Sequence, residues 1–165
     1  MTTDTSTLLA PYDHARDVPP RRGQRPRTTS TNPHAQIDQQ PETPLTEDLR
    51  ARLETLDGVS VGPSRRAPPG TNGFLLERGR GPETAFLLGT EFAHIHPGPD
   101  HSLHMTQPEP MRTGAIEAGW AEPHPLAGQP TISEHIVLIY APRDPAELEV
   151  VARLGATARQ YARGS

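Results

Sequence analysis

Proline is the residue that most limits what this chain can fold into. The sequence has 20 prolines among 165 residues, about 12% where ~5% is usual. Proline has no backbone N–H and disrupts the interior of helices and sheets, and these prolines are spread along the whole chain. We therefore expect short regular elements joined by many loops. The length suits one domain and leaves little for a second.

Two missing residue types exclude several classes of reaction. The chain has no cysteine, which rules out disulfides, cysteine-ligated zinc, iron–sulfur clusters and thiol nucleophiles. All 16 basic residues are arginine, so a Walker-type phosphate loop, a Schiff-base lysine and a lysine general base are excluded as well. A net charge of −4 creates no overall field that attracts nucleic acid. Eight histidines remain as the main reactive groups.

The N-terminal part differs in composition from the rest. It is rich in Pro, Thr, Ser and Arg and poor in apolar residues, so we expect a disordered tail over residues 1–43 and a folded domain over residues 44–165. The arginines of the tail suit a tether to an acidic surface, but a solvated tail is the favoured interpretation. Neither a membrane-spanning apolar run nor a signal sequence is evident, so we expect a cytoplasmic protein with no membrane partner.

The folded part has the pattern of an α+β domain. Apolar spacing and end signals predict three helices, over 47–57, over 110–118 and from Asp144 onward. Thr46 is the expected N-cap of the first helix. In the last helix, Glu149 and Arg153 are expected to form an i,i+4 ion pair. Short apolar runs bounded by turns predict strands at 74–76, 85–88, 91–96, 102–105 and 136–140. Strand 136–140 is continuously apolar, which is typical of a central strand. We expect a single domain with a mostly antiparallel sheet and flanking helices.

Three histidines occupy alternate positions of two predicted strands. Because side chains alternate faces along a strand, Phe92, His94 and His96 share one face. A hairpin closed symmetrically by residues 97–101 puts His94 opposite His104, and His96 opposite Ser102. This predicts a cluster of His94, His96 and His104 on one face. The opposite face is then the core, and it consists of Ala93, Ile95, Leu103 and Met105.

Such a cluster suits either of two kinds of chemistry. Imidazoles move protons near neutral pH, and they also bind transition-metal ions. The alternative is a sheet face whose histidines only form hydrogen bonds; three on one face favour a functional site. Glu91 and Asp100 are the acids nearest to the cluster. His101 is expected to be solvated at the loop tip, and no role is predicted for His14, His34 and His135.

The segment from Gly119 to Gly128 is a second candidate region. Prolines on both sides of His124 hold its backbone extended. One interpretation is that Trp120 and His124 cover a pocket for a flat ligand; the other, equally supported, makes Trp120 a core residue and His124 a cap. Tyr140 and Arg143 follow the apolar strand. Arg143 either binds a carboxylate or phenolate or only anchors the turn before the last helix.

Together these motifs resemble the luciferase-like domain family, which includes the fungal luciferases and many bacterial proteins. They are Glu-Phe-Ala-His-Ile-His, Ser-Leu-His, Gly-Trp-x-x-x-His-Pro-Leu-Ala-Gly and Tyr-Ala-Pro-Arg, and the resemblance covers roughly residues 45–163. It implies oxidation of a small aromatic or enolisable substrate by molecular oxygen, through a peroxidic intermediate and without a metal or organic cofactor. It implies proton-transfer and oxyanion-binding roles for His94, His96, His104 and His124. It also implies that Trp120 and Tyr140 wall the pocket. Phe92, on the predicted histidine face, and Arg143 complete the set of candidate substrate-binding residues.

The chain also departs from the fungal luciferases, which resemble membrane-associated proteins with an apolar N-terminal segment. Here that segment is polar, and the absence of lysine with abundant Arg, Ala, Pro and Gly suggests a GC-rich bacterial coding sequence. Neither the fungal luciferin nor light emission is expected. Two alternatives stay open: an enzyme with a divalent metal at His94, His96 and His104, and a non-catalytic ligand-binding module.

Overall fold

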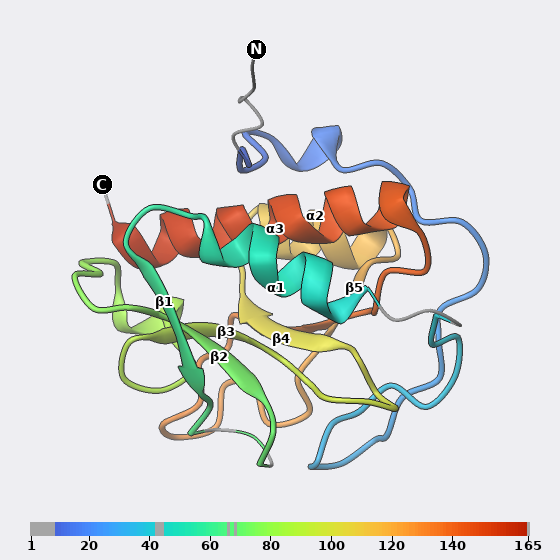
Figure 1. Cartoon of the computed structure of the whole chain (residues 1–165), viewed down its shortest axis with the longest axis horizontal. Coiled ribbons are helices and arrows are strands. Elements are labelled where there is room, and N and C mark those ends of the chain that lie inside the picture. The colour runs from blue at the N-terminus through green and yellow to red at the C-terminus, as the bar shows by residue number, and fades with distance from the viewer. Residues whose placement is uncertain (1–8, 42–44, 66, 68, 165) are drawn as a thin grey trace.

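A six-stranded sheet with helices on one face forms the molecule (Figure 1). The computed structural model describes residues 9–41, 45–65, 67 and 69–164. The strands are β1 (Val59–Pro63), β2 (Asn72–Leu76), β3 (Glu91–Ile95), β4 (Leu103–Thr106), β5 (Ala121–Pro123) and β6 (Ile136–Ile139). Their order across the sheet is β1-β2-β3-β4-β6-β5, and every neighbouring pair is antiparallel. The predicted α+β class, antiparallel sheet and interior position of strand 136–140 are confirmed.

Three α-helices accompany the sheet: α1 (Thr46–Glu54), α2 (Met111–Glu117) and α3 (Pro145–Arg163). Helix α3 begins as predicted, because the Asp144 carboxylate accepts a 2.9 Å hydrogen bond from the Glu147 amide. Its predicted Glu149–Arg153 pair is wrong. Glu149 instead accepts two hydrogen bonds from Arg52 of α1, and the Arg153 guanidinium lies 4.0 Å from the centre of the Tyr12 ring.

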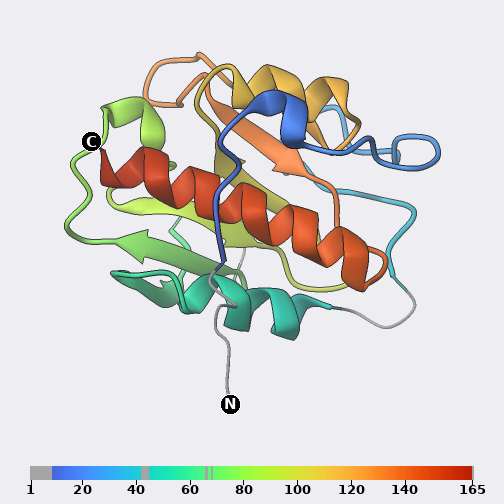
Figure 2. The same cartoon turned by 90° about the horizontal axis from the view of Figure 1, so that it is seen from above.

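The predicted core face of the hairpin packs against the helices. Ala93, Ile95, Leu103 and Met105 are at most 1% exposed and share one apolar cluster with residues of α1 and α3. Figure 2 shows α3 lying across the sheet with α1 beside it. Because the helices cover this face, the side chains that alternate with these four residues must point to the other face, where the loops lie.

Two local predictions need correction. Residues 85–88 do not form a strand: a 3₁₀ turn, η2 (Glu83–Ala85), is followed by a loop that turns at Gly89, whose φ is +59°. Apolar character at 85–88 reflects burial of Ala85 and Leu87, and the pairing of this segment is limited to one isolated bridge between Leu88 and Glu91. Thr46 is the first helical residue and not a cap; its hydroxyl lies 2.8 Å from Nδ1 of His101, so His101 is bonded within the fold and not merely solvated.

The described part of the N-terminal segment, residues 9–41, lies against the domain. It runs above α3 in Figure 1 and crosses this helix in Figure 2. There the backbone amide of Tyr12 donates to Oγ1 of Thr157 at 3.0 Å. Tyr12 and Val18 are buried in the apolar cluster. This differs from the tail predicted for residues 1–43, of which 1–8 and 42–43 lie outside the described residues. Composition reports only whether a segment can form its own core, whereas this segment adds a few anchors to an existing one.

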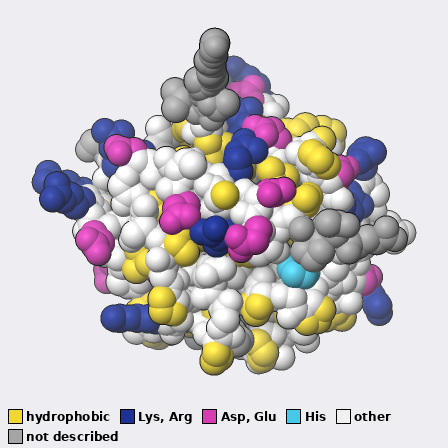
Figure 3. All heavy atoms as spheres, in the orientation of Figure 1, with side chains coloured by type: hydrophobic (Ala, Val, Ile, Leu, Met, Phe, Trp, Pro, Cys, Tyr) yellow, Lys and Arg dark blue, Asp and Glu magenta, His cyan; other side chains and the backbone are white. Residues whose placement is uncertain are grey.

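The surface carries charges of both signs. Arginine and acidic side chains are interspersed over the face drawn in Figure 3. Within the described part of the chain, no helix combines the length and apolarity needed to cross a bilayer.

Candidate functional site

One row of paired residues across four strands builds the site. His94 pairs with His104, His104 with Leu138, and Leu138 with Glu122. Directly paired residues project from the same face of a sheet, so His94, His104 and Glu122 meet on the face turned away from the helices. The predicted hairpin register is confirmed, and the His96 amide donates to the Ser102 carbonyl at 2.9 Å.

The three predicted histidines converge through ring nitrogens. Nε2 of His94 lies 3.2 Å from Nε2 of His96 and 3.2 Å from Nδ1 of His104. All three side chains are nearly enclosed, with at most 6% of each residue exposed. Three nitrogen atoms, one per ring, lie within 4.8 Å of one another.

Carboxylates hold the outer nitrogens of two of these rings. Nδ1 of His94 lies 2.8 Å from Oε2 of Glu91, and Nδ1 of His96 lies 3.0 Å from Oδ2 of Asp100. Because an ionised carboxylate only accepts hydrogen bonds, the proton of each neutral ring is on Nδ1. The sequence identified both acids as neighbours of the cluster.

A register shift in β3 brings Glu91 to the histidine face. Ala93 pairs with Phe74 but Glu91 pairs with Leu75, which leaves Phe92 as an extra residue in β3. Glu91 and His94 are an odd number of positions apart and would otherwise point to opposite faces. The same shift overturns the predicted position of Phe92, which is fully buried in the apolar core and not on the histidine face.

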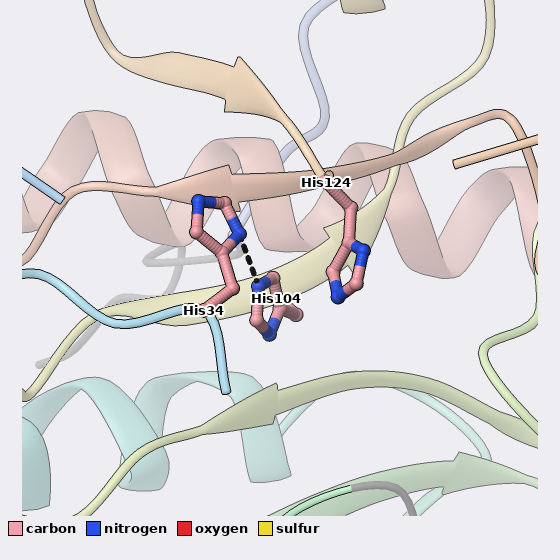
Figure 4. Close-up of side chains that lie close together, drawn as sticks. All are labelled: His34, His104 and His124. Atoms are coloured by element: carbon pink, nitrogen blue, oxygen red, sulfur yellow. Dashed lines mark hydrogen bonds between the residues drawn. The ribbon is translucent and has the colours of Figure 1, made fainter. Parts of the chain in front are cut away.

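His34, for which the sequence predicted no role, joins the cluster from the N-terminal segment. Figure 4 shows its ring beside His104, with His124 on the other side. Nδ1 of His34 lies 3.0 Å from Nε2 of His104, and Nε2 of His34 lies 2.8 Å from Oε2 of Glu122. No local signal in residues 1–43 distinguishes this histidine, because its partners come from β4 and β5.

Glu122 links the cluster to Tyr140. The Tyr140 hydroxyl donates to Oε1 of Glu122 at 2.8 Å, and the Thr28 hydroxyl donates to Oε2 at 2.7 Å. Sequence reasoning missed Glu122, although a signal existed: it stands two residues before His124 in extended backbone, and alternate residues share a face. Burial raises the pKa of Tyr140 to about 12, and its hydrogen bond to Glu122 adds to the rise.

Burial shifts the pKa of the histidines and the pKa of the carboxylates in opposite directions. Burial lowers the pKa of His94, and it lowers that of His104 well below the ordinary value, with neighbouring histidines adding to the effect. For Asp100 and Glu122 burial works to raise the pKa, but hydrogen bonds to each carboxylate outweigh it and leave the pKa lowered. These hydrogen bonds come from His96 and Ser102 to Asp100, and from His34, Thr28 and Tyr140 to Glu122. The site therefore favours neutral rings at His94 and His104 and ionised carboxylates at Asp100 and Glu122.

The cluster opens into a cavity of about 340 Å³. Its polar wall is formed by the five clustered histidines, Asp100 and Asn32. Most of the remaining lining is apolar, including Pro33, Leu87, Leu126, Ile132 and Ile136. A cavity of this size with a few convergent polar groups is typical of a small-molecule site.

Of the predicted substrate-binding residues, none is among the described residues that line this cavity. Trp120 is buried in the core, and its indole Nε1 donates to the Pro19 carbonyl at 2.6 Å. Tyr140 reaches the cluster only through Glu122. Arg143 donates from Nε to Glu147 at 2.9 Å and from its guanidinium to the Arg22 carbonyl at 2.8 Å. It therefore anchors the turn before α3.

Comparison with known proteins gives a family for this site. The model of the Luciferase domain family matches residues 89–158, which include His94, His96, His104 and His124. The luciferase of Armillaria mellea is 30% identical over 158 residues, which cover 82% of this chain and 57% of that protein. The luciferase of Armillaria ostoyae is 30% identical over 152 residues with the same coverage. The chain thus spans little more than half the length of these relatives.

No solved structure matches the chain significantly. The motifs that carry the resemblance to fungal luciferases, from Glu91 to Arg143, all lie within the matched region. The chain therefore carries a domain of the luciferase-like family, matched over residues 89–158, and is similar to fungal luciferases.

Proposed function

We propose that this chain is an oxidoreductase that uses molecular oxygen to oxidise a small aromatic or enolisable substrate bound in the histidine cavity. One observation carries the proposal: four histidines of the region matched by the family model line a largely apolar cavity of about 340 Å³. They are His94, His96, His104 and His124. An apolar wall suits a flat substrate, and a buried polar wall supplies groups for proton transfer.

Neutral imidazoles give the cavity its base. A substrate with an acidic C–H or enol O–H loses that proton to a ring nitrogen of His94, His96 or His104. The resulting carbanion transfers two electrons to dioxygen, a C–O bond forms, and the peroxide oxygen takes up one proton. The substrate is oxidised, dioxygen is reduced to the level of peroxide, and no other oxidant is needed.

His124 is suited to stabilise the negative charge that develops on oxygen. The Leu126 amide donates to its Nδ1 at 3.0 Å, so a neutral His124 ring carries its proton on Nε2. An N–H donor near a developing oxyanion typically contributes 10²–10³-fold to the rate. We therefore assign His124 as the donor and the other three histidines as the base.

The test is oxygen uptake by the full chain with a panel of enolisable aromatic compounds. The expected result is one dioxygen consumed per substrate, with the product identified by mass spectrometry. His104→Asn lowers turnover at least about 100-fold, whereas His14→Asn, which changes an exposed histidine outside the cluster, leaves it unchanged. Compounds that bind in the cavity without any oxygen uptake would make the chain a binding module instead.

A further inference from the structure

Counting protons in the histidine cluster shows which nitrogens hold lone pairs. The carboxylates of Glu91 and Asp100 fix the ring protons of His94 and His96 on Nδ1. Their Nε2 atoms, which face the centre of the cluster, therefore carry lone pairs when the rings are neutral.

The same count extends to His104 through His34. Nε2 of His34 donates to Glu122, so Nδ1 of His34 carries a lone pair and accepts from Nε2–H of His104. With His34 also neutral, Nδ1 of His104 carries a lone pair as well. In this neutral state of the rings three nitrogen lone pairs face one another, and two of the nitrogen–nitrogen distances are 3.2 Å.

We propose that this three-histidine centre binds one divalent first-row transition-metal ion, through Nε2 of His94, Nε2 of His96 and Nδ1 of His104. Metal–nitrogen bonds of ~2.0–2.1 Å put neighbouring ligand nitrogens about 3.0–3.4 Å apart, which includes the 3.2 Å observed. Neutral imidazole is a ligand for zinc, iron, cobalt, nickel or copper, and not for magnesium or calcium.

The surroundings satisfy the other requirements of a metal centre. Each ligand ring has its second nitrogen held, by Glu91, Asp100 or His34, and such partners orient the ring and raise its basicity. Three neutral imidazole ligands do not compensate the charge of a divalent ion. The nearby carboxylates of Glu91 and Asp100 supply the two negative charges that balance it. The adjoining cavity gives room for a further ligand, as catalytic centres require.

A second group of histidines, His34, His104 and His124, fits a metal less well. Nδ1 of His124 accepts from the Leu126 amide, so the neutral ring has its proton on the remaining nitrogen and offers no lone pair. His34 and His104 also use their facing nitrogens on each other. These bonds select His94, His96 and His104 as the ligand set.

For any part in catalysis this inference rests on the proposed function. With an ion bound, the three ligand nitrogens would no longer serve as the base, and the ion would instead act as a Lewis acid on a substrate oxygen. The binding itself needs no substrate. Metal binding without oxygen uptake would overturn the proposed function alone, and oxygen uptake by a protein that binds no metal would overturn this inference alone.

The experiment is a titration of the full chain, tag-free and stripped with EDTA, with Zn²⁺ by calorimetry and with Co²⁺ by visible absorption. The expected result is saturation at one equivalent that excess Mg²⁺ does not displace. His94→Gln and His104→Gln each weaken the affinity at least about 100-fold, and the matched control His14→Gln does not.

Nitrogen NMR of the wild-type histidine rings identifies the ligands even if a variant fails to fold. Zn²⁺ is expected to shift Nε2 of His94 and His96 and Nδ1 of His104, a pattern that a purely structural cluster would not give. Absence of saturable binding, equal binding by the folded variants, or a shift confined to surface histidines would overturn the proposal.

Discussion

Nδ1 of His34 lies 3.0 Å from Nε2 of His104, although the two residues are 70 positions apart. The contact joins the N-terminal segment to the centre of the sheet. A second bond reinforces it, because the backbone amide of Gln36 donates to Oδ1 of Asp100 at 3.1 Å. The segment is therefore part of the site as well as of the surface. His34 fixes the tautomer of His104, the ring that contacts every other histidine of the cluster.

Replacing His34 by alanine should damage the site more than the fold. His104 loses the acceptor of its Nε2–H, which costs about 1–3 kcal/mol of stability, and its ring loses its fixed tautomer. We expect Zn²⁺ affinity and oxygen uptake to fall about 10–100-fold. Calorimetry and urea unfolding measure the two effects. His14→Ala, in the same segment but exposed, is the control. Equal metal affinities of the two variants would contradict the role given to His34.

Gly73 makes room for the carboxylate that holds His94. A Cβ there would lie 3.2 Å from Cδ of Glu91 and 3.2 Å from Cα of Ser64, which is backbone and cannot easily move. Gly73→Ala should therefore displace Glu91 and weaken Zn²⁺ binding about tenfold or more. Gly62, its partner on β1, is the matched control, since a Cβ there meets only Leu75 Cδ1 at 3.5 Å. Equal affinities of the two alanine variants would show that Glu91 does not support the site.

Tyr140 should make the fold less stable at high pH. Burial raises its pKa from 10.0 in the ordinary state to about 12, so between these values the unfolded chain releases a proton that the folded chain keeps. Stability then falls as pH rises, by at most about 1.4 kcal/mol per pH unit from this residue. The chain has no lysine or cysteine, so few other side chains titrate there.

Chemical unfolding across this pH range, with tyrosinate absorbance recorded in parallel, measures the effect. Tyr140→Phe should flatten the slope without removing it, because burial also raises the pKa of Tyr12. An unchanged slope in Tyr140→Phe would mean that the hydroxyl is accessible to solvent.

Arg143 should matter for stability and not for the site. Arg143→Met leaves the Glu147 carboxylate, only 5% exposed, without its guanidinium partner. Discounted for the solvent that reaches Arg143, the expected cost is about 2–4 kcal/mol. The double variant Arg143→Met/Glu147→Gln should recover most of it, which thermal unfolding can measure. Zn²⁺ affinity should be unchanged, and a marked loss would restore Arg143 as a ligand-binding residue.

Much of the site could be predicted because it is built on one hairpin. Alternation of side chains and a five-residue loop are local properties, and they were enough to pair His94 with His104 and to bury Ala93 and Ile95 on the other face. Where the strand departs from regular pairing, the same reasoning failed. The extra residue at Phe92 moves that ring into the core and turns Glu91 toward His94.

The sequence by itself determined the α+β class, the family and the three-histidine face, because these follow from periodicity and short motifs that neighbouring residues express together. Only the tertiary structure decided that His34 and Glu122 complete the network and that Trp120 and Arg143 do not reach the cavity. The reason is physical: a buried imidazole needs partners for both nitrogens, and folding supplies them from whichever segments pack nearby, irrespective of their distance along the chain.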